Sequence, residues 1–388
     1  MDTVSILRCD DYILSEVKAV IARSLENIGG IDKFIQNGTK VLLKPNLLMK
    51  KRPDESVTTH NIIVQAVAEL AAEAGGVVTI ADSPGGLYNP TVLRGLYRVC
   101  GIEAVAAETG AALNLETGHK LVDYPQGIHS AQNAHGKSFP IIDPILDADV
   151  IINLPKLKTH MMMFYSGAVK NMFGAIPGVY KAEYHFTTPE QDKFADMLLD
   201  LCACIKPTIS IMDGIWGMEG QGPSSGIPRK FGVILASASP YALDAVATNI
   251  LGITPDEALT VSRAEERGMC GAFDTIPLVG DDIAAFRIND LIKPPIGTPD
   301  FVKVFALTRP FAKQLNRMMS PKPKFDRKTC VGCGDCAACC PAHALYMKER
   351  KVVLEKKECI SCFCCQELCP KKAIHVKRNW AMRIALRY

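Results

Sequence analysis

The sequence predicts an α/β protein with a mainly parallel sheet, followed by a small second unit of different character. The α/β prediction rests on the segment from Val4 to about Ile292, where short β-branched runs alternate with longer runs of helical period. The second unit is indicated by cysteine, since ten of the 15 cysteines lie between Cys330 and Cys369. Cysteine at this density without a secretory signal favours metal ligation over disulfides.

The elements of the α/β part follow from length and period. Six short apolar runs are strand candidates: Val4–Arg8, Lys40–Leu48, Val77–Ala81, Val150–Leu154, Thr208–Met212 and Phe231–Ala236. The clearest helices have apolar residues at three- and four-residue spacing: Ser15–Leu25, Asn61–Ala74, Glu190–Cys204 and Tyr241–Ile250. Ligands of such sheets gather at the carboxyl ends of the strands, so polar residues that follow each strand are candidate site residues.

Charge divides the chain in the same region as cysteine. Residues from Phe325 to Tyr388 carry 13 Lys and Arg against 6 Asp and Glu, whereas the rest of the chain carries 31 against 35. We therefore expect an α/β body at 1–295, a basic helical linker at 296–324 and a cysteine-rich domain with a basic tail at 325–388. The run from Ser320 to Lys324 alternates proline and lysine and is interpreted as the stiff end of the linker.

Composition and charge also exclude some classes. No apolar run reaches the 18 or more residues of a membrane span, so no transmembrane helix is expected. The first residues lack a basic and an apolar signal region, which favours a cytoplasmic location. Nucleic-acid binding is disfavoured because the positive charge is confined to the C-terminal part and has no interleaved aromatic residues.

The cysteine-rich part contains a tandem repeat. Cys-x2-Cys-x2-Cys-x3-Cys-Pro begins at Cys330 and recurs at Cys359. In this spacing three cysteines ligate one iron–sulfur cube and the fourth, beside proline, ligates the other. We therefore expect two 4Fe-4S clusters with crossed ligation. The first set of ligands is Cys330, Cys333, Cys336 and Cys369, and the second set is Cys359, Cys362, Cys365 and Cys340.

Two alternatives bear on this motif. Structural zinc sites use paired Cys-x2-4-Cys arms, which the repeated run of three Cys-x2 steps does not match. Cys339 and Cys364 lie out of register and are interpreted as free cysteines beside the clusters. The lysines and arginines of the tail either steer an acidic redox partner or form a solvated face that balances cluster charge, and the sequence leaves both open.

In the α/β part, polar residues follow several predicted strands. They are the candidate residues for binding an anionic cofactor or substrate: Lys44, Asn46, Asp82, Ser83, Gly85, Lys156, Lys158, His160, Lys170, Asn171 and Asp213. Four of them are lysines, which suit a phosphate or carboxylate. Taken singly, each lysine is better interpreted as a surface charge, and it is the set of four that favours an anion site. The glycine patterns of nucleoside triphosphate and dinucleotide sites are absent, and catalytic residues are not identified.

The body resembles the domain of unknown function 362 family. The resemblance is carried by Leu42–Leu47, Thr58–His60, Ala81–Gly85, Asn153–His160, Gly167–Gly174 and Asp213-Gly214. The C-terminal part resembles the bacterial two-cluster ferredoxin domain, a small α+β fold, over about Phe325 to Lys377. The resemblance implies an α/β body joined to 4Fe-4S clusters in a redox setting, and it leaves the reaction open.

The leading hypothesis is an iron–sulfur oxidoreductase that passes single electrons between a soluble carrier and an anionic substrate or cofactor on the body. A flavin fits this role because it accepts one or two electrons and carries a phosphate, although no residue specifies it. The rivals are a non-enzymatic electron-transfer subunit that docks a partner redox enzyme, and a protein that handles iron–sulfur clusters. A bound small molecule would support the oxidoreductase. A stable partner protein would support the electron-transfer subunit, and labile clusters would support the cluster-handling protein.

Overall fold

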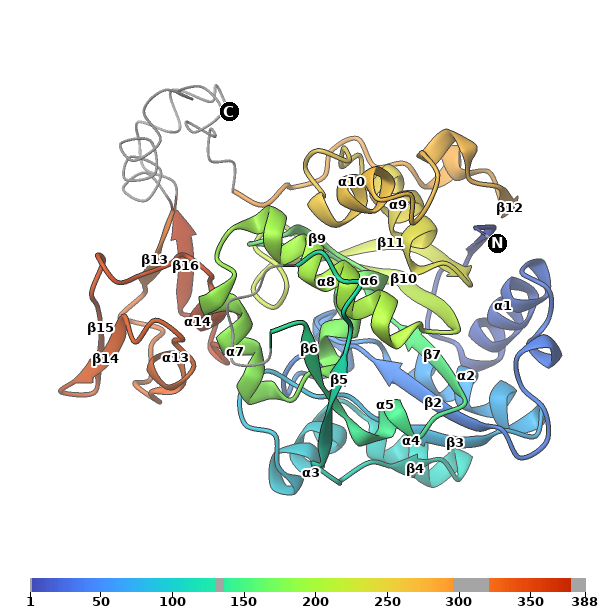
Figure 1. The fold of residues 1–388 in the computed structure, drawn as a ribbon, viewed down its shortest axis with the longest axis horizontal. Helices are drawn as coiled ribbons and strands as arrows, with labels where there is room; N and C mark the ends of the chain where they lie inside the picture. Colours follow the sequence, from blue (N-terminus) through green and yellow to red (C-terminus); the bar gives the residue numbers. More distant parts are fainter. Residues whose placement is uncertain (1, 130–135, 296–320, 378–388) are drawn as a thin grey trace.

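The computed structural model describes residues 2–129, 136–295 and 321–377, which form a large α/β body and a smaller domain beside it (Figure 1). Of the predicted helical linker at 296–324, residues 296–320 lie outside the described residues. The central sheet of the body has ten strands, eight of which follow the order β12-β1-β11-β10-β7-β2-β3-β4. The strands of the body are β1 (Val4–Arg8), β2 (Lys40–Pro45), β3 (Val77–Ile80), β4 (Ala112–Leu113), β5 (His119–Asp123), β6 (Ser138–Ile142), β7 (Val150–Leu154), β8 (Lys156–His160), β9 (Phe164–Ser166), β10 (Ile209–Glu219), β11 (Ile227–Ser237) and β12 (Leu278–Gly280).

Most neighbouring strands run parallel, which confirms the predicted fold class. β2 pairs in parallel with both β3 and β7, and β7 pairs in parallel with β10. The exceptions in this sheet are β11, which runs antiparallel to both β1 and β10, and β9, which runs antiparallel to β8. All six predicted strands are present, but β10 extends to Glu219 and β11 begins at Ile227, so both are longer than predicted.

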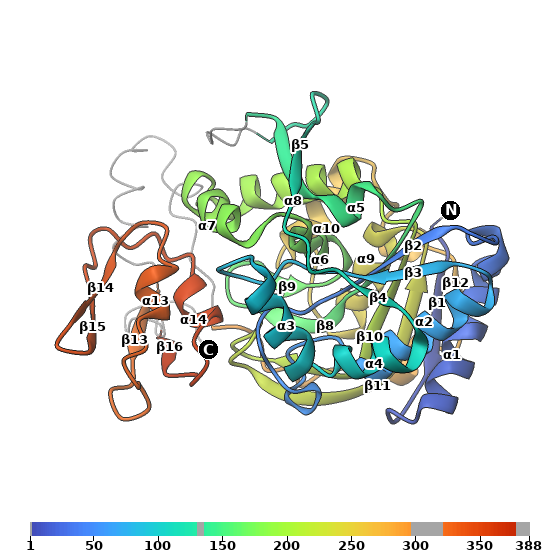
Figure 2. The ribbon, with the colours of Figure 1, turned by 90° about the horizontal axis from the view of Figure 1, so that it is seen from below.

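Helices cover both faces of the sheet (Figures 1 and 2). They are α1 (Leu14–Asn27), α2 (Asn61–Glu73), α3 (Pro90–Val99), α4 (Ile102–Thr109), α5 (Asp143–Leu146), α6 (Ala168–Asn171), α7 (Gly178–Thr187), α8 (Gln191–Ile205), α9 (Pro240–Ile250) and α10 (Leu259–Glu266). Alternate residues of each strand enter opposite cores. In β11, for example, Val233 and Leu235 pack with α8 and α9, whereas Ile234 and Ala236 pack with α1 and α2. The result is a three-layer body with its polar site at the strand ends.

Six strands of the body were not predicted: β4, β5, β6, β8, β9 and β12. Of these, β8 bears on the site, because its residues Lys156–His160 were predicted only as polar residues that follow the fourth strand, yet they pair with β10 and β9. Pro155 separates β8 from β7, because proline has no N–H for the ladder. The alternation of β8 sends Lys156, Lys158 and His160 to one side and Leu157 and Thr159 to the other.

The smaller domain contains two short β-ladders and two helices of one turn. Its elements are β13 (Lys322–Phe325), α13 (Asp335–Ala338), β14 (Leu345–Lys348), β15 (Lys351–Leu354), α14 (Cys364–Glu367) and β16 (Ile374–Lys377). β13 pairs with β16 along its whole length, so Lys322 to Lys324 belong to the domain and the linker ends earlier than predicted. Proline is tolerated at Pro323 because β13 has β16 as its one partner.

Candidate functional site

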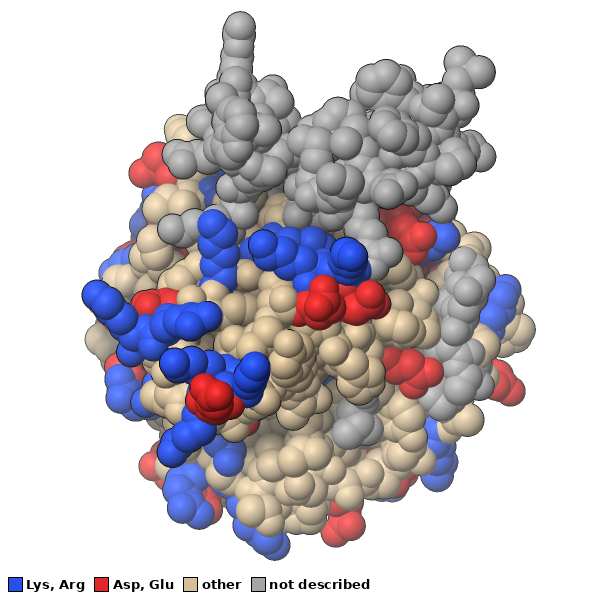
Figure 3. All heavy atoms as spheres, turned by 90° about the vertical axis from the view of Figure 1, so that its left-hand side faces the viewer, with Lys and Arg blue, Asp and Glu red and all other residues tan. Residues whose placement is uncertain are grey.

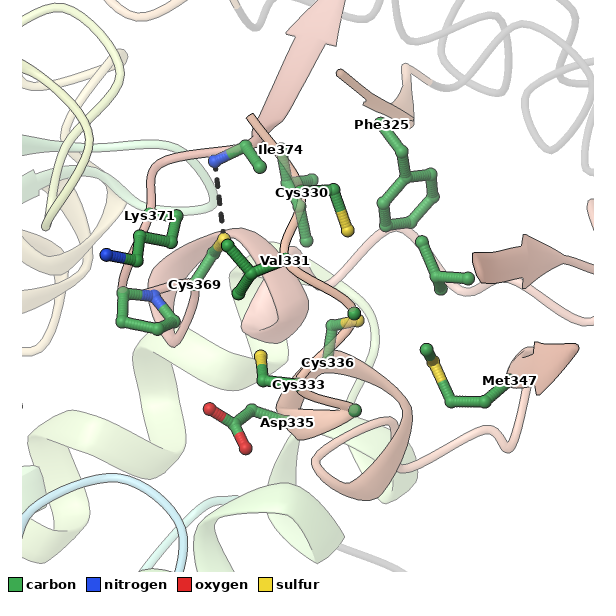
Figure 4. A pocket seen from close by; sticks show the side chains of 15 residues that line it. Phe325, Cys330, Val331, Cys333, Asp335, Cys336, Met347, Cys369, Lys371 and Ile374 are labelled. Carbon is green, nitrogen blue, oxygen red and sulfur yellow. Dashed lines mark hydrogen bonds between the residues drawn. The ribbon is translucent and has the colours of Figure 1, made fainter. Parts of the chain in front are cut away.

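The cysteines of the smaller domain surround two cavities. One is lined by Cys330, Cys333, Cys336 and Cys369, which we call the outer set (Figure 4). The other is lined by Cys340, Cys359, Cys362 and Cys365, which we call the inner set. Each cavity thus brings together three cysteines of one repeat and the Cys-Pro cysteine of the other.

The lining of both cavities suits an iron–sulfur cluster. Each offers four sulfurs and several apolar side chains, such as Phe325 and Met347 in the outer cavity. Backbone amides also donate to the Cys-Pro sulfurs, from Ala344 to Cys340 and from Ala373 to Cys369, each at 3.3 Å (Figure 4). Hydrogen bonds to sulfur and a hydrophobic shell are among the features that tune such clusters.

Two of the predicted lysines in the body are neutralised by buried aspartates. Lys44 Nζ at the end of β2 lies 2.7 Å from Asp82 Oδ1, and Lys156 Nζ on β8 lies 2.8 Å from Asp213 Oδ2. All four side chains are almost completely buried, and burial lowers the pKa of both lysines while the aspartates counteract it. A buried charge needs such a partner, so these pairs hold the strand ends together.

The Lys156–Asp213 pair is part of a larger network. Asp213 also accepts hydrogen bonds from the Tyr12 hydroxyl at 2.8 Å and from the backbone N–H of His60 at 2.9 Å. The Tyr12 ring stacks on His60, with ring centroids 3.6 Å apart. Burial and the Asp213 charge raise the pKa of Tyr12 well above its usual value, so its hydroxyl stays protonated and donates.

Three asparagines connect the strand ends in a chain of hydrogen bonds. Lys158 Nζ donates to Asn46 Oδ1 at 2.6 Å, and Asn46 Nδ2 donates to Asn171 Oδ1 at 2.9 Å. Asn171 Nδ2 then donates to Asn153 Oδ1 at 2.8 Å. Asn153, which lies within β7, was not among the predicted site residues because it does not follow a strand.

A buried aspartate fixes the segment that carries Lys170 and Asn171. Asp244 on α9 accepts hydrogen bonds from the backbone N–H groups of Ala168 and Val169 at 2.6 and 3.0 Å and from Tyr165 at 2.9 Å. Burial raises the pKa of Asp244 to about 6, and these three donors counteract the shift. A Cβ at Gly167 would overlap Asp244 Oδ1, so the turn before α6 requires glycine.

Three lysines near the smaller domain lack a carboxylate partner. Among the described residues no ion pair reaches Lys158, Lys170 or Lys181. Lys158 also donates to the carbonyl oxygen of Val57 at 2.7 Å, and Lys181 on α7 donates to the carbonyl oxygens of Ser83 and Pro84. Burial lowers the pKa of Lys158 and of Lys181 to about 7, and it also lowers the pKa of Lys170. We call these three side chains the cationic cluster.

His160 connects the cationic cluster to the smaller domain. Its Nδ1 accepts hydrogen bonds from the backbone N–H groups of Met162 and Met163 at 3.0 and 3.2 Å, so the proton of the neutral ring is on Nε2. That atom faces Glu367 Oε1 of α14 at 2.9 Å. Burial lowers the pKa of His160 to about 4, which keeps the ring neutral at pH 7. Burial raises the pKa of Glu367, but His160 and Lys170 outweigh it and hold the pKa at about 2.

Other contacts seat α14 on the body. Gln366 Nε2 donates to the carbonyl oxygen of Gln221 at 3.0 Å, and Ser224 Oγ donates to that of Glu367 at 2.7 Å. Phe363 and Val376 are buried against Met161. A Cβ at Gly85 would lie 2.7 Å from Leu368, so Gly85 leaves room for the smaller domain. The residues around the inner set therefore form the contact with the body.

Several polar groups at this contact are unsatisfied. Ser83 Oγ and His185 Nδ1 are buried and have no hydrogen-bond partner among the described residues. His185 stacks on Phe194 with ring centroids 4.6 Å apart, and its pKa is lowered to about 3 by burial first and by Lys170 and His160. Unsatisfied buried polar groups beside unpaired cations are typical of a ligand site.

The structure brings all predicted body residues into one region, with different roles. Two ion pairs hold four of these residues, Lys44 with Asp82 and Lys156 with Asp213. The other charged or titratable residues, Lys158, Lys170 and His160, face the smaller domain. The candidate residues from the sequence did not include Lys181, His185, Asp244 or Glu367. Lys181 and His185 lie on α7, which follows no strand. Glu367 lies inside the cysteine motif, which was interpreted only through its cysteines.

Comparisons with known proteins agree with this arrangement. Residues 41–249 match the family described as domain of unknown function (DUF362), and residues 322–370 match a 4Fe-4S dicluster domain. A thylakoid-associated protein of Synechocystis sp. is 35% identical over 270 residues, which are 69% of this chain and 80% of that protein. In the described part of the chain, no helix is long and apolar enough to cross a membrane.

Solved structures show a weaker likeness. The lactate racemase apoprotein of Thermoanaerobacterium thermosaccharolyticum is 13% identical with a TM-score of 0.34, over 54% of this chain and 50% of that one. A protein of Thermotoga maritima is also 13% identical with a TM-score of 0.34, over 55% and 52%. The match thus spans about half the length of each of these proteins.

Proposed function

Because the chain belongs to the DUF362 family and carries a 4Fe-4S dicluster domain, we propose that it is an iron–sulfur electron-transfer protein that acts on an anion bound by its body. The anion would lie between the cationic cluster and α14. The observation that carries this proposal is the group of three lysines without carboxylate partners beside the inner set.

The outer and inner sets are the proposed ligands of two 4Fe-4S clusters, with the crossed ligation expected from the repeat. Each cluster supplies one-electron chemistry when bound. The cysteines hold the clusters, and the contact of α14 with the body fixes the distance from the inner set to the cationic cluster. His160 and Glu367 bridge that gap and help to hold α14 in place.

Charge balance favours an anionic ligand. Lys158, Lys170 and Lys181 lie within electrostatic reach of Glu367, so three potential positive charges face one negative charge. An uncompensated buried charge is strongly destabilising, and a ligand phosphate or carboxylate would compensate it. Ser83 and His185 offer further hydrogen bonds. A flavin phosphate is one such anion, and the reaction would then be that of an oxidoreductase.

The rival is an electron-transfer subunit that binds no small molecule. In that case the cationic cluster would only offset the negative charge of the inner cluster, and electrons would pass to a docked enzyme. The proposal also includes a soluble carrier as electron donor or acceptor. It places the protein in a reducing compartment such as the cytoplasm, where the thiolates stay free for iron.

The test compares full-length wild type with the double variant Lys158→Met and Lys170→Met, purified anaerobically. About eight iron atoms are expected in both, since neither lysine is a ligand. Denaturation followed by mass spectrometry identifies any released anion. The matched control is Lys120→Met with Lys193→Met, two exposed lysines of the body.

Single-turnover reoxidation then tests function. Chemically reduced protein is mixed with the released compound, with flavin mononucleotide and with small phosphorylated or carboxylated acceptors. We expect wild type and control to be reoxidised by the compound that binds, and the double variant to react at least ~10-fold more slowly, as for loss of about 1.4 kcal/mol of binding. Equal rates in all three proteins would contradict the proposed site, and no reoxidation in any of them would favour the rival.

A further inference from the structure

The two halves of the cysteine repeat differ at the positions between the cysteines, where the motif does not fix the residue type. Gly334, Asp335, Ala337 and Ala338 flank Cys336 in the first half. The equivalent residues around Cys365 in the second half are Phe363, Cys364, Gln366 and Glu367. All four of the latter are buried, whereas none of the former is. The second half has therefore become the contact with the body, and the first half has not.

The outer set is more exposed to solvent than the inner set. Cys333 is exposed, and the neighbouring Val331 is 52% exposed although it is apolar. Pro370 and Lys371, which line the same cavity, are exposed too. In the inner set, by contrast, Cys359 and Cys365 are buried. The Pro370 carbonyl oxygen accepts a hydrogen bond from Lys51 of the body at 3.5 Å, so a protein partner would approach the outer set from the exposed side of Val331 and Cys333.

The surface around the outer set is basic. Between Lys322 and Lys377 the chain has 12 Lys and Arg against 6 Asp and Glu, and one of those acids, Glu367, is buried. Lys371 lines the outer cavity, and Arg350 lies against Gly332, between two of its cysteines. Asp335 is the acidic residue in the lining. Basic side chains are prominent on the face of the molecule that the smaller domain presents (Figure 3).

We propose that the outer set is the port at which an acidic protein carrier exchanges electrons, while the inner set serves the body. The carrier would be an iron–sulfur or flavin protein with an acidic face, seated over Val331 and Cys333 and held by Arg350 and Lys371. One electron leaves the reduced carrier and enters the oxidised outer cluster, so the carrier is oxidised by one electron and the cluster reduced by one. This inference rests on the proposed clusters but not on the identity of the anion in the body.

The test uses the cluster-loaded full chain and a reduced acidic plant-type 2Fe-2S ferredoxin as the probe. The port variant is Arg350→Glu with Lys371→Glu, and the matched control is Lys120→Glu with Lys193→Glu, which changes the net charge equally on the body. Affinity for the oxidised probe and the second-order rate of cluster reduction are measured at low and high ionic strength. A viologen radical that carries one sulfonate group and is therefore net neutral serves as a reductant that charge does not steer.

At low ionic strength we expect the port variant to lose at least ~10-fold in both affinity and rate, and the control less than half of that factor. High salt should remove the difference, and the viologen rate should be unchanged. Equal losses in port variant and control, or no loss in the port variant, would overturn the proposal. If the port variant binds less iron, Arg350→Gln with Lys371→Gln replaces it, with the same expected order. A result that overturns the proposed port does not change the outcome of the reoxidation test of Lys158 and Lys170. The two proposals can therefore be rejected independently.

Discussion

The paired and the unpaired lysines at the strand ends differ in environment more than in sequence. Lys44 and Lys156 each follow or lie in a buried strand and meet an aspartate, and their pairs tie neighbouring strands together. Lys158 is two residues from Lys156 on the same strand, yet it meets an asparagine and a carbonyl oxygen. One lysine-rich edge therefore contains a structural half, in which the lysines are paired with aspartates, and a second half, in which Lys158 has no carboxylate partner among the described residues.

The largest expected loss of stability comes from a variant that breaks a buried ion pair of the structural half. In Asp213→Ala, Lys156 becomes a buried charge without a partner, and Tyr12 and His60 lose an acceptor. We expect a loss of about 3–5 kcal/mol in the free energy of unfolding. Denaturant unfolding measures it, and the double variant Lys156→Met with Asp213→Leu should be less destabilised. A loss below about 1 kcal/mol in Asp213→Ala would show that the pair does not stabilise the sheet.

The next largest loss of stability is expected from a glycine variant beside the Lys44–Asp82 pair. A Cβ at Gly174 would overlap Asp82 and lie 2.5 Å from Lys44 Nζ, so Gly174→Ala displaces the second buried ion pair. We expect it to cost about 1–3 kcal/mol. Gly85→Ala is the matched control, because its new methyl group meets the flexible end of Leu368. Equal costs for the two variants would contradict the structural role of the Lys44–Asp82 pair.

Removing a lysine of the cationic cluster should change the free energy of unfolding less than Asp213→Ala does, and it can raise the stability. Lys158→Met replaces a buried cation with an apolar side chain of similar length. We expect the free energy of unfolding to change by less than ~1 kcal/mol or to increase, because no charge is left without its partner. Thermal and denaturant unfolding of ligand-free protein check this. A loss as large as that of Asp213→Ala would place Lys158 in the structural half.

A further expected effect is the pH dependence of ligand-free protein. Burial lowers the pKa of Lys158 and Lys181 to about 7 from 10.5, so the unfolded chain binds more protons than the folded one between these values. Stability should therefore rise with pH from about 7 towards 10. Anion binding needs the protonated lysines and should weaken over the same range. In Lys158→Met with Lys181→Met both slopes should flatten, and unchanged slopes would assign them to other groups.

Much of the fold followed from periodicity, because the core strands and the long helices carry clear apolar patterns. β8 was missed because its lysines read as a polar loop, whereas in the structure their alkyl chains are buried and their ammonium groups are bonded. The convergence of the strand-end residues followed from the rule for parallel sheets. The pairing of Lys44 with Asp82 could not be predicted, since register and side-chain direction decide it.

The contact between the two domains was also beyond sequence reasoning. The spacing of the cysteines fixes which residues share a cavity, but the residues between them carry no pattern that names a partner surface. Glu367 and Gln366 are polar residues in a basic domain, and only the structure shows them buried against His160 and Gln221. Lys181 and His185 join the site through the packing of α7, which no motif marks.

The most direct measurement is an EPR-monitored redox titration of cluster-loaded wild type and of Lys158→Met with Lys170→Met. Positive charge near a cluster stabilises its reduced state and raises its reduction potential. If the cationic cluster lies against the inner set, the double variant should lower the potential of one of the two clusters by tens of millivolts and leave the other unchanged. Equal shifts of both clusters, or no shift of either, would contradict the proposed arrangement.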